Sequence, residues 1–179
     1  SDVEKIIKDL EKVIDDNRRT NEKAIRDAED IIRRSEEHSR KVIEKLKKII
    51  KEVKEEAERL KGDERVVKEL EDELRKVKKE WEDVSKENRD TNRRVLEELK
   101  KILEDSKRHL DKALKKVRDD GVDEEEVRRV EEEIKKLLED SRRLLRRIEE
   151  ESRRLDEEDE RLMKEIDDEI RELLERIRR

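Results

Sequence analysis

The chain has 179 residues, of which 61% are charged, 29% hydrophobic and 1% aromatic. Its 58 acidic and 52 basic residues leave a formal net charge of -6 and are interspersed, so no single-sign surface is offered to nucleic acid or an anionic membrane. Without cysteine, disulfides, thiolate chemistry and Cys-based zinc sites are excluded. No apolar run approaches the roughly 18–20 residues of a membrane span, and the N-terminus is unlike a signal peptide, so we expect a soluble chain without a targeting signal.

Two glycines divide the chain into near-equal thirds. Glycine just past a helix end supplies the left-handed residue that stops the helix, so Gly62 and Gly121 predict two turns between three helices. Asp63 and Asp123 follow as candidate N-caps of the next helices. Ser1 and Asp123 each have a glutamate three residues later, which is the spacing of a capping box. These start and stop signals occur at the expected helix ends and nowhere else.

Between these signals the apolar residues recur at spacings of three and four, as in Ile7, Leu10 and Ile14. The high charge content alone would also fit disorder, but a sustained heptad argues against it. Ile6 and Val13 add a third apolar position per heptad, which favours three or four helices around one core. Short turns make successive helices antiparallel. We therefore predict an all-α fold, a long antiparallel up-down-up three-helix bundle of coiled-coil type. It forms a single domain over residues 1–179, with helices at about 2–61, 64–119 and 123–178.

Asn, Ser, Thr, His and one Asp interrupt the apolar stripe in two places. In an antiparallel pair, residues at nearly equal distances from the turn lie level, which pairs Asn17 with Ser106 and Ser35 with Asn88. Folding the third helix back about Gly121 completes two expected polar layers. The first holds Asn17, Thr20, Asn21, Ser106, His109 and Ser141; the second holds Ser35, His38, Ser39, Ser85, Asn88, Thr91, Asn92, Ser152 and Asp159.

A buried amide or hydroxyl without a partner costs about 1–3 kcal/mol, so members of such a layer should bond one another. Slipping one helix by a heptad would place many of them against aliphatic side chains, and we therefore interpret the layers as structural groups that set the register. The alternatives are a ligand or proton site, and simple exposure at the edge of the stripe.

The sequence predicts no enzyme, no metal site and no cofactor. The only histidines, His38 and His109, lie about 24 residues apart along the bundle, or roughly 36 Å by helical rise, and cannot share an ion. Asp159 near His38 resembles an acid–imidazole pair, but no nucleophile accompanies it. A pH response is the remaining hypothesis, since buried neutral imidazoles would have to charge near pH 5. Trp81, the only aromatic residue, is expected in the core.

The whole chain resembles de novo designed helical bundles that carry buried hydrogen-bond networks. The resemblance rests on near-equal helices, capping boxes, Glu/Lys/Arg on every outer face, and the absence of Pro, Cys, Phe and Tyr. It also rests on the turns Lys61–Glu64 and Asp120–Glu126 and on polar residues set among charges in Arg34–Ser39 and Asn88–Asn92. Natural three-helix rods such as spectrin-type repeats are usually richer in aromatics and less regular.

The resemblance implies a monomeric scaffold, one half of a heterodimer, or a cage whose groove accepts a helix, made by recombinant cytoplasmic expression. A cage normally has a latch helix in the same chain, and the fourth helix is missing from this sequence. We therefore expect no natural biochemical activity but a designed structural scaffold that requires no partner. The alternative is a designed interaction module that binds a partner helix or a second copy. The pH response through buried histidines belongs to this alternative.

Overall fold

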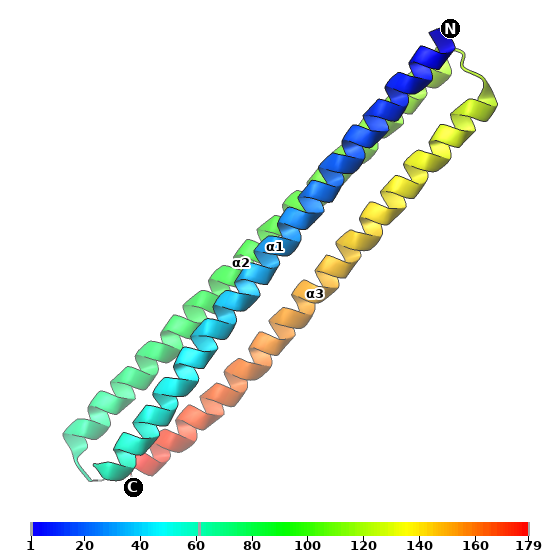
Figure 1. Cartoon of the computed structure of the whole chain (residues 1–179). Coiled ribbons are helices and arrows are strands. Elements are labelled where there is room, and N and C mark those ends of the chain that lie inside the picture. The colour runs from blue at the N-terminus through cyan, green and yellow to red at the C-terminus, as the bar shows by residue number, and fades with distance from the viewer. Residues whose placement is uncertain (1, 61, 179) are drawn as a thin grey trace. The chain divides into compact units, whose positions relative to one another are not determined.

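A computed structural model describes residues 2–60 and 62–178 of the chain. Three helices follow one another, α1 (Asp2–Arg59), α2 (Glu64–Asp119) and α3 (Glu124–Arg178). Figure 1 shows them side by side with alternating directions. The predicted all-α antiparallel three-helix bundle is confirmed. The described helix ends lie close to the predicted ones, while the predicted end at residue 61 and the predicted cap at Ser1 lie outside the described residues.

The helices end at the two glycines because both adopt the left-handed backbone conformation that other residues avoid. Gly62 has a φ of 98° and Gly121 a φ of 76°. The N–H of Gly121 donates to the carbonyl of Arg118 at 3.1 Å, which satisfies one carbonyl of the last turn of α2. At the start of α2 the carboxylate of Asp63 accepts from the N–H of Arg65 at 3.1 Å and caps the helix.

Tertiary contacts divide the chain into two compact units, and every helix contributes a segment to each. Unit 1 comprises Ser1–Ile31 and Arg93–Glu151, and unit 2 comprises Ile32–Asn92 and Ser152–Arg179. The single domain expected from the sequence stays a prediction, and each unit is described by itself below.

Unit 1 buries an aliphatic core contributed by all three helices. Its members come from the heptad positions read in the sequence, because only one stripe of each helix faces its neighbours. Val122, between α2 and α3, joins this core beside Val127. The clustered core residues of this unit are Ile7, Leu10, Ile14, Leu110, Leu114, Val117, Val122, Val127, Val130, Ile134 and Leu137.

Unit 2 has an equivalent core, which includes Trp81. This side chain is 0% exposed, and its Nε1 has no hydrogen-bond acceptor within the described part of the chain. Leu46 and Leu74 are also fully buried in the same core. The indole therefore acts by filling volume, because the polar edge that usually finds a partner in a buried tryptophan gains none.

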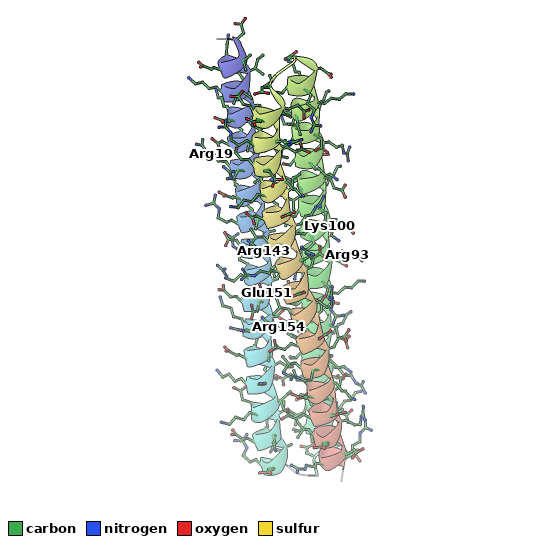
Figure 2. The ribbon with its side chains drawn as sticks, turned by 90° about the vertical axis from the view of Figure 1, so that its right-hand side faces the viewer. Arg19, Arg93, Lys100, Arg143, Glu151 and Arg154 are labelled. Carbon is green, nitrogen blue, oxygen red and sulfur yellow. The ribbon has the colours of Figure 1, made fainter. Side chains whose placement is uncertain are left out.

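Charged side chains cover the outer faces of all three helices. Figure 2 shows this for Arg19, Arg93, Lys100, Arg143 and Glu151 of unit 1 and for Arg154 of unit 2. Exposed pairs such as Arg118–Glu131 at 2.6 Å and Arg178–Glu71 at 2.9 Å join neighbouring helices. Within the described ranges no helix is long and apolar enough to cross a membrane.

Candidate functional site

The polar residues of unit 1 form a hydrogen-bonded group that joins the three helices. Asn21 on α1 is 1% exposed, and its Nδ2 donates to Ser106 Oγ on α2 at 3.1 Å and to Ser141 Oγ on α3 at 3.4 Å. The Ser106 hydroxyl in turn donates to Asn17 Oδ1 at 3.1 Å. We call Asn17, Asn21, Ser106 and Ser141 the Asn21 cluster.

The Asn21 cluster leaves little of its polar surface without a partner. Asn17 Nδ2 donates to the carbonyl of Val13 at 2.8 Å, one turn back in its own helix. Among the described residues, Asn21 Oδ1 is the atom of this cluster that is buried without a hydrogen bond. A buried acceptor of this kind costs on the order of 1–3 kcal/mol, which offsets part of the stability that the hydrogen bonds of the cluster contribute.

The polar residues of unit 2 bond between α1 and α2. Asn88 Nδ2 donates to Ser39 Oγ at 2.7 Å and to the backbone carbonyl of Ser35 at 3.0 Å. The Ser35 hydroxyl donates to Asn92 Oδ1 at 3.0 Å. We call Ser35, Ser39, Asn88 and Asn92 the Asn88 cluster. Unlike the Asn21 cluster, it makes no hydrogen bond with α3 within the described residues.

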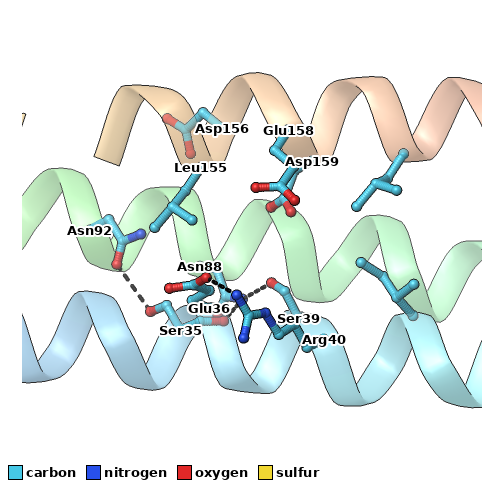
Figure 3. A pocket seen from close by; sticks show the side chains of 12 residues that line it. Ser35, Glu36, Ser39, Arg40, Asn88, Asn92, Leu155, Asp156, Glu158 and Asp159 are labelled. Atoms are coloured by element: carbon cyan, nitrogen blue, oxygen red, sulfur yellow. Dashed lines mark hydrogen bonds and ion pairs between the residues drawn. The ribbon is translucent and has the colours of Figure 1, made fainter. Parts of the chain in front are cut away.

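On the α3 side a small cavity separates the Asn88 cluster from two carboxyl groups. The cavity has a volume of about 40 Å³, and α3 contributes Asp156 and Asp159 to its lining, with Leu155 and Leu162 beside them. Figure 3 shows Asp159 on the α3 side and Asn88 with Ser39 on the opposite side. A water needs about 10–15 Å³ of such space, so the cavity is large enough for solvent to enter.

The two carboxyls have raised pKa values because they are partly removed from water. Burial raises the pKa of Asp159 to about 6, while Arg89 lowers it and the nearby charges of Asp156, Glu158 and Glu36 raise it further. Burial also raises the pKa of Asp156, again against Arg89, with Glu160 adding to the rise. Arg89 is shared, since its guanidinium lies 3.6 Å from the carboxylate of Glu160. It therefore compensates this acidic surface only in part.

Three residues that the sequence places in the polar layers are exposed instead. His38 and His109 both present exposed side chains, so the expectation of buried imidazoles is wrong. Thr20 is exposed as well, and its hydroxyl donates to the carbonyl of Asp16 in its own helix at 2.9 Å. The buried stripe advances by four residues at these points, from Ser35 to Ser39 and from Ser106 to Leu110. A residue three positions on is then rotated about 100° away from the next buried position and faces solvent.

The remaining predicted residues lie in unit 2 near the Asn88 cluster. Ser85 and Ser152 are buried, and Thr91 is half-buried. Within the described chain no hydrogen bond links these three side chains to the cluster. They lie in the polar part of the stripe but take no part in the hydrogen bonds of the Asn88 cluster.

The sequence reading missed the acidic partner of Asp159 and the cation that faces it. Asp156 lies four residues after Ser152 and three before Asp159, so the helical period places all three on one face of α3. That spacing was a usable signal. The sequence gives no comparable signal for Arg89. Its side chain is half-buried, whereas most arginines of the chain are exposed, and nothing in the pattern distinguishes it from them.

The clusters have the chemistry of structural hydrogen bonding. Within residues 2–60 and 62–178, no group of three or more His, Cys, Asp or Glu side chains is placed to hold a metal ion. The Asn and Ser side chains of both clusters bond one another and backbone carbonyls of their own bundle.

Comparison with solved structures gives a distant likeness. No protein-family model matches the chain, and no curated protein matches it. Among solved structures, a protein described as a computationally designed three helix bundle aligns with 98% of this chain and 85% of its own, at 15% sequence identity and a TM-score of 0.46. At that level the likeness is too distant to bear on function.

Proposed function

We propose that the chain is a designed structural scaffold, an antiparallel three-helix bundle whose register is set by buried polar side chains. The observation that carries the proposal is Asn21, a fully buried amide that donates to a serine on each of the other two helices. A single side chain with partners on both neighbours constrains the axial position of all three helices.

A shift of one helix by a heptad, about 10 Å along its axis, is the error that such a cluster opposes. One heptad on either side of Ser141 the stripe of α3 carries Ile134 and Ile148, both buried. After a shift, Asn21 would lie against one of these isoleucines and lose its bond to Ser141. Every polar group left without a partner costs about 1–3 kcal/mol, whereas the aliphatic positions can exchange with one another at little cost.

The interaction module is the weaker candidate, because a groove for a further helix would present a broad apolar surface. Among the large hydrophobic residues that the structure describes, only Val3 is exposed, with 41% of its surface accessible to solvent. The doubled seam positions such as Ile6 and Val13 are half-buried. These observations support a scaffold in preference to a module.

The test removes three amides from the two clusters, those of Asn21, Asn88 and Asn92, and measures the register of the helices. The chain has no cysteine, so Arg19→Cys and Arg143→Cys, on exposed faces of α1 and α3 in unit 1, provide two unique spin-label sites. We expect the parent to give one narrow distance distribution by pulsed electron resonance. The variant Asn21→Leu, Asn88→Leu, Asn92→Leu should remain helical and equally or more resistant to denaturant. It should, however, add populations displaced by about 10 Å or self-associate.

The matched control replaces three buried aliphatic residues with isomers, Ile14→Leu, Leu74→Ile and Leu110→Ile, and should keep one distance. A single unchanged distribution in the triple Asn→Leu variant would show that these buried amides do not set the register. Sedimentation equilibrium of the parent distinguishes the module, since a dimer that binds an apolar dye would overturn the scaffold proposal.

A further inference from the structure

The α3 segments of the two units present different chemical groups to the polar clusters. In unit 1, α3 supplies Ser141, a neutral hydroxyl that accepts a hydrogen bond from Asn21. In unit 2, α3 supplies the Asp156 and Asp159 carboxyls, which line the cavity beside the Asn88 cluster. A hydroxyl keeps its charge state at any pH, but a carboxyl does not. The contact of α3 in unit 2 can therefore respond to protons, while its contact in unit 1 cannot.

The cavity is where such a response would act. Its lining includes the polar side chains of the Asn88 cluster from α1 and α2 and three carboxyl residues from α3, Asp156, Glu158 and Asp159. A protonated carboxyl can donate a hydrogen bond to an oxygen such as Ser39 Oγ or Asn88 Oδ1, directly or through one water. Two ionised carboxylates on the same helix face repel each other and demand hydration, which favours a wider opening.

We propose that unit 2 contains a proton-linked contact between α3 and the Asn88 cluster. α3 packs closely against the cluster while Asp156 and Asp159 share a proton, and the contact loosens when both carboxyls are ionised. The contact is a regulatory feature that goes beyond the scaffold role, because a rigid scaffold requires only neutral groups at this position.

Charged groups from all three helices surround Asp159; the acidic ones favour retention of its proton, and Arg89 opposes it. From α1, Glu36 and Arg40 line the cavity and pair with each other through a hydrogen bond. From α2, Arg89 faces the carboxyls but is shared with Glu160. On α3 itself, Asp156, Glu158 and Glu160 add negative charge. His38 has an exposed side chain and does not line the cavity.

The direction of the pH effect follows from the raised pKa. Burial raises the pKa of Asp159 from 3.8 to about 6, so between these values the folded chain holds a proton that the unfolded chain has released. The stability that Asp159 contributes is therefore fully present below about pH 4, falls as the pH rises to about 6, and stays at its lower value above that. Buried histidines would produce the opposite slope.

The experiment compares urea unfolding of the full chain and of Asp159→Asn between pH 4 and pH 7.5. A full shift of two pKa units would change the unfolding equilibrium constant about a hundredfold, and solvent at this half-buried site reduces that effect. We expect the parent to have an unfolding constant roughly tenfold above that of D159N at pH 7.5 and within about twofold of it at pH 4. Asp156→Asn should act in the same direction, which keeps the test decisive if D159N folds poorly.

Two controls isolate the pair. Glu157→Gln removes the same charge from an exposed neighbouring position on α3 and should give a ratio that does not change with pH. His38→Asn should leave the pH dependence of the parent intact. A carboxyl ¹³C titration of Asp159 should have its midpoint near pH 6. A D159N ratio that stays constant from pH 4 to pH 7.5, or a pH dependence that disappears in H38N, would overturn the proposal.

Discussion

At the scale of single residues, asparagine and serine play unequal parts in the two clusters. An amide has two donor hydrogens and an acceptor oxygen, so Asn21 and Asn88 each reach two partners at once. A hydroxyl can also be satisfied within its own helix, as Thr20 is by the carbonyl of Asp16. Asn21 and Asn88 therefore require particular neighbours on other helices, whereas Ser35 and Ser106 also donate, to the amide oxygens of Asn92 and Asn17.

Trp81 is the residue whose loss should cost the most stability. It is fully buried in the core of unit 2, and its indole gains no hydrogen bond among the described residues, so its contribution is packing. We expect Trp81→Ala to lower the free energy of unfolding by about 3–5 kcal/mol, measured by circular dichroism in urea. Trp81→Phe should cost much less, because it keeps most of the volume and removes the unpaired N–H. A cost below about 1 kcal/mol for W81A would contradict this account of the core.

At the scale of helices, the boundaries were predictable because the chain marks them with residues of special backbone conformation. Gly62 and Gly121 are glycines with positive φ, and nothing else in the sequence competes with them as a stop signal. Residues nearly equidistant from Gly62 were expected to lie level, and Asn17 and Ser106 are hydrogen bonded at 3.1 Å. The position of the turn is thus enough to predict which residues of α1 and α2 lie level.

Rotation about the helix axis was less predictable. His38 was expected beside Ser39 in a buried layer, but adjacent residues point about 100° apart and only one of them can face the core. The apolar spacing alternates between three and four residues, so two adjacent positions can each fit the buried stripe. When both positions hold polar residues, the spacing does not predict which of them is buried. The same ambiguity hides Asp156, because its apolar neighbour Leu155 also fits the seam position.

Replacement of Gly121 tests the glycine stop signal. The φ of 76° disfavours a β-carbon, while the space around Gly121 is open, with nothing within 4 Å of an added Cβ. We expect Gly121→Ala to destabilise the fold by about 1–2 kcal/mol in urea unfolding, through backbone strain alone. Gly121→Asn should cost less, because asparagine tolerates the left-handed conformation. Equal costs for the two substitutions would show that the left-handed backbone is not the cause.

At the scale of the whole molecule, charge gives the chain its surface and the core gives it specificity. Exposed ion pairs such as Lys100–Glu149 at 3.6 Å contribute no more than about 1 kcal/mol each and are screened by salt. With 58 acids and 52 bases, many alternative pairings are available to every charged side chain. The buried amides have few alternatives, which is why we propose that they and not the surface charges determine the arrangement of the helices.

The prediction of a single domain can be tested through a residue in each unit. Every helix runs without interruption from one unit into the other, as α1 does at Ile31 and Ile32, and helix formation is cooperative along the chain. We expect Leu110→Ala, a fully buried change in unit 1, to lower the stability by about 2–5 kcal/mol. The shift should appear equally in circular dichroism and in the fluorescence of Trp81, which lies in unit 2.

Leu46→Ala, a fully buried change in unit 2, provides the matched control, because it should move both signals whether the units are coupled or not. A Trp81 fluorescence transition that stays at the parent midpoint in L110A, while part of the helical signal is lost earlier, would mean that the two units unfold independently. Coincident transitions would mean that the continuous helices make the two units one cooperative domain, since a loss of packing in unit 1 is then felt at the indole in unit 2.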